Sequence, residues 1–247
     1  AKWYEEGEKS NKYFLNMIKR RSAQTNIEKI VTEEGEADSQ EGIATLIKNF
    51  YSSLYSEKET IIENDENYLK DLPQLSEEDR RNLDREITLE ELEKTLKECN
   101  DSAPGPDGIP YSIYLHFWNK LGPVLLKSWQ HSVKIGKLSD GQRLSTITLL
   151  PKEGKDKLKI ENWRPITLTN CDVKIFTKLL SKRVSSVLHK IIIPTQTAYI
   201  PGRQVADNLR LLEMYRSYCE RIEEEAILVS LDAKKAFDSV NHKYMYK

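Results

Sequence analysis

The residues from 227 to 238 restrict the fold more strongly than any other part of the chain. The apolar run Ile227-Leu228-Val229-Ser230-Leu231 leads into Asp232, and Phe237 follows five residues later. This pattern predicts a strand that ends in a carboxylate, then a tight turn and an aromatic side chain. Carboxylate oxygens are preferred ligands of hard divalent cations, so Asp232 is a candidate metal ligand. The alternative is an aspartate that only caps the turn.

The formal net charge of −1 conceals an uneven distribution. Residues 1–100 carry 15 Lys and Arg against 24 Asp and Glu, whereas residues 101–247 carry 23 against 15. A basic surface suits a protein that neutralises phosphates, and ordinary solvated lysines are the alternative. The cysteines and histidines have no disulfide or zinc spacing. Because the sequence has no signal peptide and no apolar run near 20 residues, we expect an intracellular protein without a membrane anchor, in the nucleus or the cytoplasm.

Helical periodicity and capping signals divide the N-terminal part. We expect a helix over residues 1–20, a turn at 31–36, a helix over 39–54 and a polar loop over 56–74. Ser76 with Asp79, and Thr88 with Glu91, have the spacing of capping boxes that open short helices.

The second half mixes helices and strands. Prolines exclude a helix at 104–110, and helices are expected over 111–121 and from Pro123 to residue 133. Residues 143–150 and 163–168 are predicted to be the strands of a hairpin. Thr169 and Asp172 form a capping pattern before a helix over 173–191, and a last helix is expected over 205–220. The apolar face of the 173–191 helix is Val173, Phe176, Leu180, Val184, Val187 and Ile191, with Lys174, Lys178, Lys182 and Arg183 on its other face.

Four blocks of sequence resemble a reverse transcriptase, most closely the enzymes of LINE-type (non-LTR) retrotransposons. In family order the blocks are Ser102–Pro110 (SAPGPDGIP), Leu149–Lys152 (LLPK) with Asn162–Ile166 (NWRPI), Gln196–Arg203 (QTAYIPGR) and Leu231–Asp238 (LDAKKAFD). Residues 3–14 also resemble the segment that precedes the polymerase in LINE proteins. The resemblance spans nearly the whole chain and is least distinctive in residues 31–85.

This resemblance implies an α+β fold, namely the fingers and a partial palm of a right-hand polymerase after a mainly helical N-terminal extension. The implied boundaries are 1–98 for the extension, 99–225 for the fingers and the start of the palm, and 226–247 for the first palm strand and its motif. In the family, paired aspartates and a thumb follow, and two-metal chemistry needs carboxylates from more than one element. We therefore expect a truncated enzyme that is inactive alone and that lacks the palm and thumb segment of the same polyprotein.

The resemblance also assigns chemistry. A DNA primer on an RNA template would attack a deoxynucleoside triphosphate (dNTP) with its 3′-hydroxyl. Asp232 and the backbone carbonyl of Ala233 would hold Mg²⁺, with two ions in the complete enzyme and Mn²⁺ as an alternative. Lys152 and Arg164 would bind the triphosphate, because Arg grips phosphate oxygens bidentately and Lys acts as a compact charge. Two exposed cations without a ligand are the alternative.

Further nucleotide contacts are implied after the aspartate. The backbone N–H groups of Lys235 and Ala236 would support the phosphates, and the ring of Phe237 would exclude a 2′-hydroxyl. A core aromatic is a compatible interpretation of Phe237. We expect Asp238 to make a structural hydrogen bond near Asn241 rather than to bind metal.

Two turns would contact the template strand, although glycine is common in turns for conformational reasons alone. Their residues are Gly105, Asp107, Gly108, Gly202 and Arg203. Two alternatives remain open for the whole chain. One is a non-catalytic RNA-binding or interaction remnant, which would bind phosphates with steep salt dependence and incorporate no nucleotide. The other is a reverse transcriptase of the group II intron type.

Overall fold

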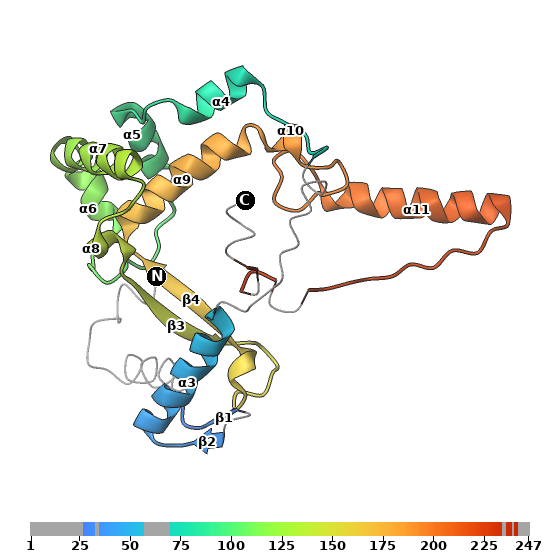
Figure 1. The fold of residues 1–247 in the computed structure, drawn as a ribbon, viewed down its shortest axis with the longest axis horizontal. Helices are drawn as coiled ribbons and strands as arrows, with labels where there is room; N and C mark the ends of the chain where they lie inside the picture. The colour runs from blue at the N-terminus through green and yellow to red at the C-terminus, as the bar shows by residue number, and fades with distance from the viewer. Residues whose placement is uncertain (1–26, 33–34, 57–69, 234–235, 239, 242–247) are drawn as a thin grey trace, which may run out of the picture. The chain divides into compact units, whose positions relative to one another are not determined.

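The computed structural model describes residues 27–32, 35–56, 70–233, 236–238 and 240–241 (Figure 1). The helix expected over residues 1–20 lies outside them. The chain divides into two compact units. Unit 1 comprises residues 1–62, 147–167 and 233–247, and unit 2 comprises residues 63–146 and 168–232.

Unit 1 is built on a short hairpin and one helix. β1 (Ile30–Thr32) pairs antiparallel with β2 (Gly35–Ala37), so the region predicted as a turn also forms two strands. α3 (Gln40–Tyr55) confirms the predicted helix, and the Ser39 hydroxyl caps it by accepting from an N–H of its first turn. The core consists of Ile30, Ile43, Ile160 and Trp163.

The predicted long hairpin is confirmed. β3 (Ser145–Pro151) and β4 (Trp163–Thr169) pair in a two-stranded sheet, and the 3-10 helix η2 (Ile160–Asn162) ends the loop between them. Residue 143, predicted to begin the first strand, instead ends the short helix α8 (Asp140–Arg143). The chain passes between the two units along these strands, at residues 146–147 and 167–168.

Unit 2 is a helical assembly with α9 at its centre. Its helices besides α8 are α4 (Glu77–Asp84), α5 (Leu89–Lys97), α6 (Tyr111–His116), α7 (Trp118–Ile135), α9 (Cys171–Ser185), α10 (Leu188–Ile191) and α11 (Val205–Ile222). Fully buried Trp129 of α7 stacks on Phe176 of α9, with ring centroids 4.0 Å apart and planes within 4°. α5 packs against both α7 and α9. None of the described helices is long and apolar enough to span a membrane.

Two predicted helix boundaries are wrong. The break between the first two helices after residue 110 falls at Phe117, and Pro123 lies inside α7. Pro123 is the sixth residue of α7, where a proline removes one helical hydrogen bond and crowds the carbonyl four residues before it. Trp118 and Trp129 lie on either side of Pro123 in the same core, and their burial offsets that cost.

The predicted helix over 173–191 forms in two parts, and its predicted apolar face is buried only in part, at Val173, Phe176 and Val187. α9 begins after Asn170, not Thr169, and ends at Ser185, and α10 is separate. Leu180 and Val184 are 37% and 45% exposed, whereas Leu179 is buried. The face that packs in the core of unit 2 therefore keeps Val173 and Phe176 of the predicted face and replaces Leu180 and Val184 with Ile175 and Leu179.

The two predicted capping boxes open α4 and α5. The Ser76 and Thr88 hydroxyls accept from the N–H groups of Asp79 and Glu91 at 3.1 and 3.2 Å. The two carboxylates bind cations distant in sequence. Lys190 Nζ lies 2.7 Å from an oxygen of Asp79.

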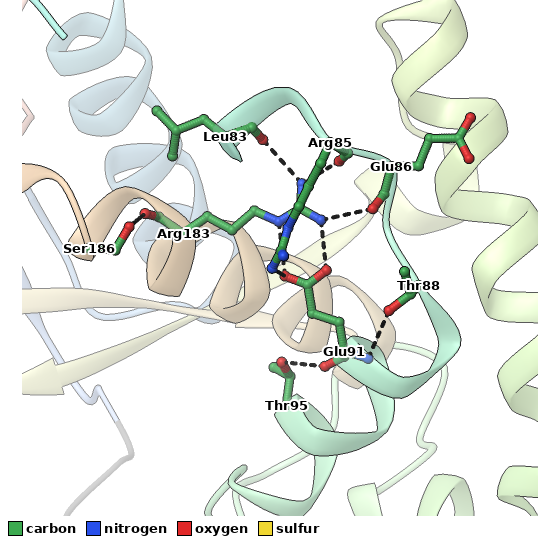
Figure 2. Close-up of polar contacts among 8 residues, drawn as sticks. All are labelled: Leu83, Arg85, Glu86, Thr88, Glu91, Thr95, Arg183 and Ser186. Atoms are coloured by element: carbon green, nitrogen blue, oxygen red, sulfur yellow. Dashed lines mark hydrogen bonds and ion pairs between the residues drawn. The ribbon is translucent and has the colours of Figure 1, made fainter. Parts of the chain in front are cut away.

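The Glu91 carboxylate binds Arg183 (Figure 2). Arg183 is predicted to lie on the exposed basic face of its helix, but it is buried. The Nε and Nη2 groups of Arg183 donate to the Glu91 carboxylate at 2.9 and 2.6 Å. Its remaining N–H groups donate to the carbonyl oxygens of Leu83, Arg85 and Glu86. The hydrogen bonds from Arg183 hold the pKa of Glu91 below its usual value. One guanidinium thus fixes the α4–α5 connection to α9.

α11 confirms the predicted last helix, but the strand predicted after it is absent. Figure 1 shows α11 extending away from the other helices of unit 2, and none of its residues is buried. Residues 224–233 have no regular secondary structure, and Ile227 and Leu231 are each 90% exposed. A strand needs a hydrogen-bonding neighbour, and the described part of the chain offers none beside this segment.

Candidate functional site

The β3–β4 hairpin carries two predicted triphosphate ligands, Lys152 and Arg164. The ammonium of Lys152 donates to the carbonyl oxygen of Glu161 at 2.8 Å, and its backbone N–H donates to that of Asn162 at 2.8 Å. These bonds close the loop and fix Lys152 just after β3. Arg164, near the start of β4, is exposed. The hairpin thus presents one anchored cation and one that faces solvent.

The loop between these strands is held by its own side chains. The Asp156 carboxylate accepts the N–H of Leu158 at 3.0 Å, and the Asn162 amide donates to the Asp156 carbonyl oxygen at 2.9 Å. The indole N–H of buried Trp163 donates to the Lys157 carbonyl oxygen at 2.8 Å. The loop conformation is therefore specified locally, with Trp163 anchoring it in the core of unit 1.

The predicted metal and sugar ligands lie on exposed chain. Asp232 and Ala233 are exposed, as is Ala236, and Phe237 is 95% exposed. Lys235 lies outside the described residues. The core-aromatic interpretation of Phe237 is wrong for this structure. Within the described part of the chain, no three His, Cys, Asp or Glu side chains converge as a metal centre.

Asp238 makes a tertiary hydrogen bond inside unit 1. The Tyr55 hydroxyl donates to its carboxylate at 3.4 Å. Burial raises the pKa of neighbouring Tyr51 to about 12, with the charges of Tyr55 and Asp238 adding to the effect. The structure therefore gives Asp238 a structural partner on α3, which agrees with the predicted kind of bond and adds an unforeseen partner.

The first predicted template turn packs against the start of α9. The N–H of Gly108 donates to the Gly105 carbonyl oxygen at 3.0 Å, and the Asp107 carboxylate accepts the N–H of Ile109 at 3.0 Å. The side-chain oxygen of Asn170 accepts the N–H of Asp107 at 3.3 Å. A Cβ atom on Gly105 would lie 2.3 Å from that oxygen, so this position has room only for glycine.

An open pocket of about 510 Å³ borders this turn within unit 2. Pro106 and Asp107 line it from the turn, and Gln142, Asn170 and Asp172 line it from α8 and α9. The Gln142 amide donates to the Asp172 carboxylate at 2.9 Å. Its lining contains no Lys or Arg, so the pocket suits an uncharged hydrogen-bonding group better than a phosphate.

In the second predicted template turn, the side chain of Arg203 bonds to backbone carbonyls that precede it in the chain. The guanidinium of Arg203 donates to the carbonyl oxygens of Ile192 at 2.8 Å, Gln196 at 2.7 Å and Ile193. Gly202 has φ +79°, a conformation that favours glycine. Arg203 thus fixes the connection between α10 and α11.

Asn170 is the residue that the sequence analysis missed. It is the N-cap of α9, yet its side chain makes no capping bond. Its amide donates to the Gly141 carbonyl oxygen at 3.2 Å and accepts from Asp107, so α8, the turn and α9 meet on one side chain. An asparagine between a strand and a helix indicates a cap, and no sequence signal points to these distant partners.

The predicted site residues are distributed over both units. Lys152, Arg164 and Phe237 belong to unit 1, and Asp232 belongs to unit 2. Within unit 2, the structure brings the Gly105–Gly108 turn together with Asn170. Within unit 1, Lys152 and Arg164 share the hairpin.

Comparison with known proteins gives consistent matches. Residues 150–247 match the family described as reverse transcriptase (RNA-dependent DNA polymerase). Over 240 residues, 96% of the chain, the sequence is 32% identical to the Transposon TX1 uncharacterized 149 kDa protein of Xenopus laevis. It is 30% identical over 64% of the chain to the retrovirus-related Pol polyprotein from the type-1 retrotransposable element R2 of Popillia japonica. A third relative, from the type-2 element R2DM of Drosophila melanogaster, is 28% identical over 59% of the chain.

The chain corresponds to a small part of each relative. It spans 18% of the Xenopus protein, 21% of the Popillia protein and 13% of the Drosophila protein.

Proposed function

The chain belongs to the reverse transcriptases of LINE-type (non-LTR) retrotransposons, and we propose that it carries the fingers and first palm motif of a right-hand polymerase. The alignment with a transposon protein along 96% of the chain carries the proposal. The match to the reverse transcriptase family over residues 150–247 supports it, as does the mixed helical and sheet fold. Residues 1–98 would be the N-terminal extension, 99–225 the fingers and the start of the palm, and 226–247 the incomplete palm.

Asp232 and the carbonyl oxygen of Ala233 would hold Mg²⁺ or Mn²⁺. Both are oxygen ligands on exposed chain, which fits the coordination preference of a hard cation. When bound, two such ions stabilise the attacking and leaving oxygens of phosphoryl transfer. Asp232 supplies one carboxylate of the several that two ions need. The remaining carboxylates would come from another segment of the polyprotein.

The hairpin would bind the triphosphate of an incoming dNTP. Lys152 is already fixed across the loop, so it would present a positioned charge with little loss of side-chain freedom. Arg164 is exposed and can grip two phosphate oxygens at once. The exposed ring of Phe237 would stand against the sugar, and the N–H groups of Lys235 and Ala236 would support the phosphates.

The exposed apolar surface of unit 2 supports association with the rest of the polyprotein. Val205, Leu209, Leu212 and Tyr215 are among the exposed large apolar residues of α11. This face is broader than a coiled-coil seam and suits packing against a layer of structure. The run Ile227–Leu231 is apolar at four of five positions, which is typical of a strand buried on both faces.

Primer extension tests the proposal. The polypeptide encoded by the whole reading frame should extend a DNA primer on an RNA template, and the 247-residue chain alone should not. Asp232→Asn should reduce extension by about a thousandfold or more, because a metal ligand is lost. Asp238→Asn, the same change in the same block, should retain extension because that carboxylate bonds to Tyr55.

Extension that persists in Asp232→Asn would refute the role of this residue. A whole product that binds RNA but incorporates no nucleotide would instead identify a non-catalytic remnant.

A further inference from the structure

One ridge of α9 follows a neighbouring stretch of chain. Its residues lie four apart, at Asn170, Lys174, Lys178 and Lys182, so their side chains project from the same side of the helix. We call these four residues the α9 ridge. Each contacts the segment of residues 98–107, which lies between α5 and α6 and leads into the first template turn. All of these residues belong to unit 2.

The contacts run in order along both segments. Lys182 pairs with the Glu98 carboxylate, and Lys178 donates to the Glu98 carbonyl oxygen. Lys174 donates to the Ala103 carbonyl oxygen at 2.8 Å and lies 3.4 Å from the Ser102 hydroxyl. The segment therefore lies along the helix in the opposite direction, with one contact at every helical turn.

The contacts continue into the turn itself. Asn170 accepts the N–H of Asp107, and the backbone at Gly105 passes so close that a Cβ would overlap the Asn170 side chain. The Asn170 side chain does not cap its own helix, where the Asp172 carboxylate accepts the N–H of Val173 at 2.7 Å instead. The side-chain amide is thus committed to the turn rather than to the helix that it begins.

The ridge lysines are occupied by this segment. An ammonium has three N–H donors. Lys174 directs them at two oxygens, those of Ala103 and Ser102, whereas Lys152 of the hairpin has one such partner, Glu161, and keeps two donors for a phosphate. The resemblance to a nucleic-acid enzyme by itself favours these lysines as phosphate ligands. Their partners point instead to the turn, whose Pro106 and Asp107 line the pocket beside Asn170.

We propose that the α9 ridge is a set of positioning residues, which hold residues 98–107 and so place the Gly105–Gly108 turn and its pocket for an uncharged part of a single-stranded RNA template. The inference rests on the proposed function for its ligand. The positioning itself is a property of the chain and can be measured without RNA.

Lys174→Met tests the ridge, with Lys127→Met as the matched control. Methionine keeps the length and apolar contacts of the side chain and removes the charge. Lys127 is exposed on α7, so its variant makes the same charge change away from the ridge. Hydrogen exchange at residues 103–109 should become roughly tenfold faster in Lys174→Met, because the turn has lost an anchor, and should not change in Lys127→Met. Lys174→Arg should restore protection, since Arg can donate to the same carbonyl.

RNA binding separates positioning from phosphate contact. With a short fluorescent single-stranded RNA, Lys174→Met should raise Kd roughly threefold to tenfold through the loss of preorganisation, and the salt dependence should stay that of the native chain. A lysine that neutralises one phosphate would instead lower the slope of log K against log salt by about 0.7. Asn170→Ser, at the other end of the ridge, should likewise raise Kd and leave the salt dependence unchanged.

Each outcome has a distinct meaning. If the native chain binds no RNA while exchange at 103–109 responds as expected, the proposed function fails and the positioning stands. If the native chain binds RNA but Lys174→Met leaves both exchange and Kd unchanged, the inference is overturned. A reduced salt slope would overturn it as well and make Lys174 a direct phosphate ligand.

Discussion

At Gly105, sequence and structure require glycine for different reasons. The Pro-Gly-Pro pattern predicts a turn, in which glycine is common for its conformational freedom. The structure shows that the constraint is space. A Cβ atom at this position would lie 2.3 Å from the side-chain oxygen of Asn170 and 2.4 Å from its backbone nitrogen. Gly108, three residues on, has φ +69° and open space around it, so there the requirement is conformational.

We predict that Gly105→Ala destabilises unit 2 by about 1–3 kcal/mol, the usual cost of forcing extra atoms into a packed site. Gly141→Ala is the control, because a Cβ at Gly141 meets nothing within 4 Å. Urea denaturation of the two variants measures the difference. Equal stability of both variants would show that the turn moves away from Asn170 without cost.

Arg183 is the charged residue with the most tertiary bonds in the described part of the chain. We predict that Arg183→Met destabilises unit 2 by about 3–5 kcal/mol, since three carbonyl oxygens lose their donor and the Glu91 carboxylate keeps the exposed Arg85 guanidinium in place of a buried one. Arg80→Met is the control. Arg80 and Glu77 form an exposed ion pair, and such pairs contribute roughly 0–1 kcal/mol. Thermal unfolding should rank the two variants clearly apart.

The Arg183–Glu91 ion pair predicts that the stability of unit 2 depends on pH. Because Arg183 lowers the pKa of Glu91 in the folded state, the contribution of the pair is present above the unfolded pKa of a glutamate, about 4.3. It is lost as the pH falls from there through the lowered folded pKa. Denaturation of the native protein and of Glu91→Gln, measured from neutral to acidic pH, should therefore converge at low pH. A constant difference would contradict the assignment.

At the scale of elements, α9 shows which property of a helix its sequence determines. The apolar periodicity and the capping pattern predict a helix, and a helix forms. The sequence offers two adjacent apolar ridges, one through Leu180 and Val184 and one through Cys171, Ile175 and Leu179. The second is buried because α5 and α7 supply its partners. Periodicity alone does not distinguish two ridges of similar hydrophobicity.

α11 provides the contrasting case, a regular amphipathic helix with no buried residue. We predict that Leu209→Ala, at a position 63% exposed, changes the free energy of unfolding by less than about 0.5 kcal/mol. Leu179→Ala, at 1% exposed, should cost about 2–5 kcal/mol. Urea denaturation compares them. A large loss in Leu209→Ala would show that α11 is covered in solution, for instance by a second copy of the chain.

At the scale of the whole molecule, each unit has its own hydrophobic core. We predict that Ile43→Ala in unit 1 and Leu96→Ala in unit 2 each weaken hydrogen-exchange protection mainly in their own unit, because the core residues they contact differ. Mass spectrometry of peptides from β1 and from α5 reads the two units separately. Joint loss of protection in both variants would show that the chain unfolds as one cooperative unit.

The sequence by itself determined the elements whose cause is local: the β3–β4 hairpin, the capped starts of α3, α4 and α5, and the family resemblance that the comparisons confirm. The tertiary structure decided which charges are buried and which apolar residues are not. Arg183 and Glu91 are 92 residues apart, and Asn170 meets a turn 63 residues away. The run 227–231 has strand composition, but no described strand lies beside it to form hydrogen bonds. Burial and strand pairing depend on partners distant in the chain, and a local pattern carries no information about those partners.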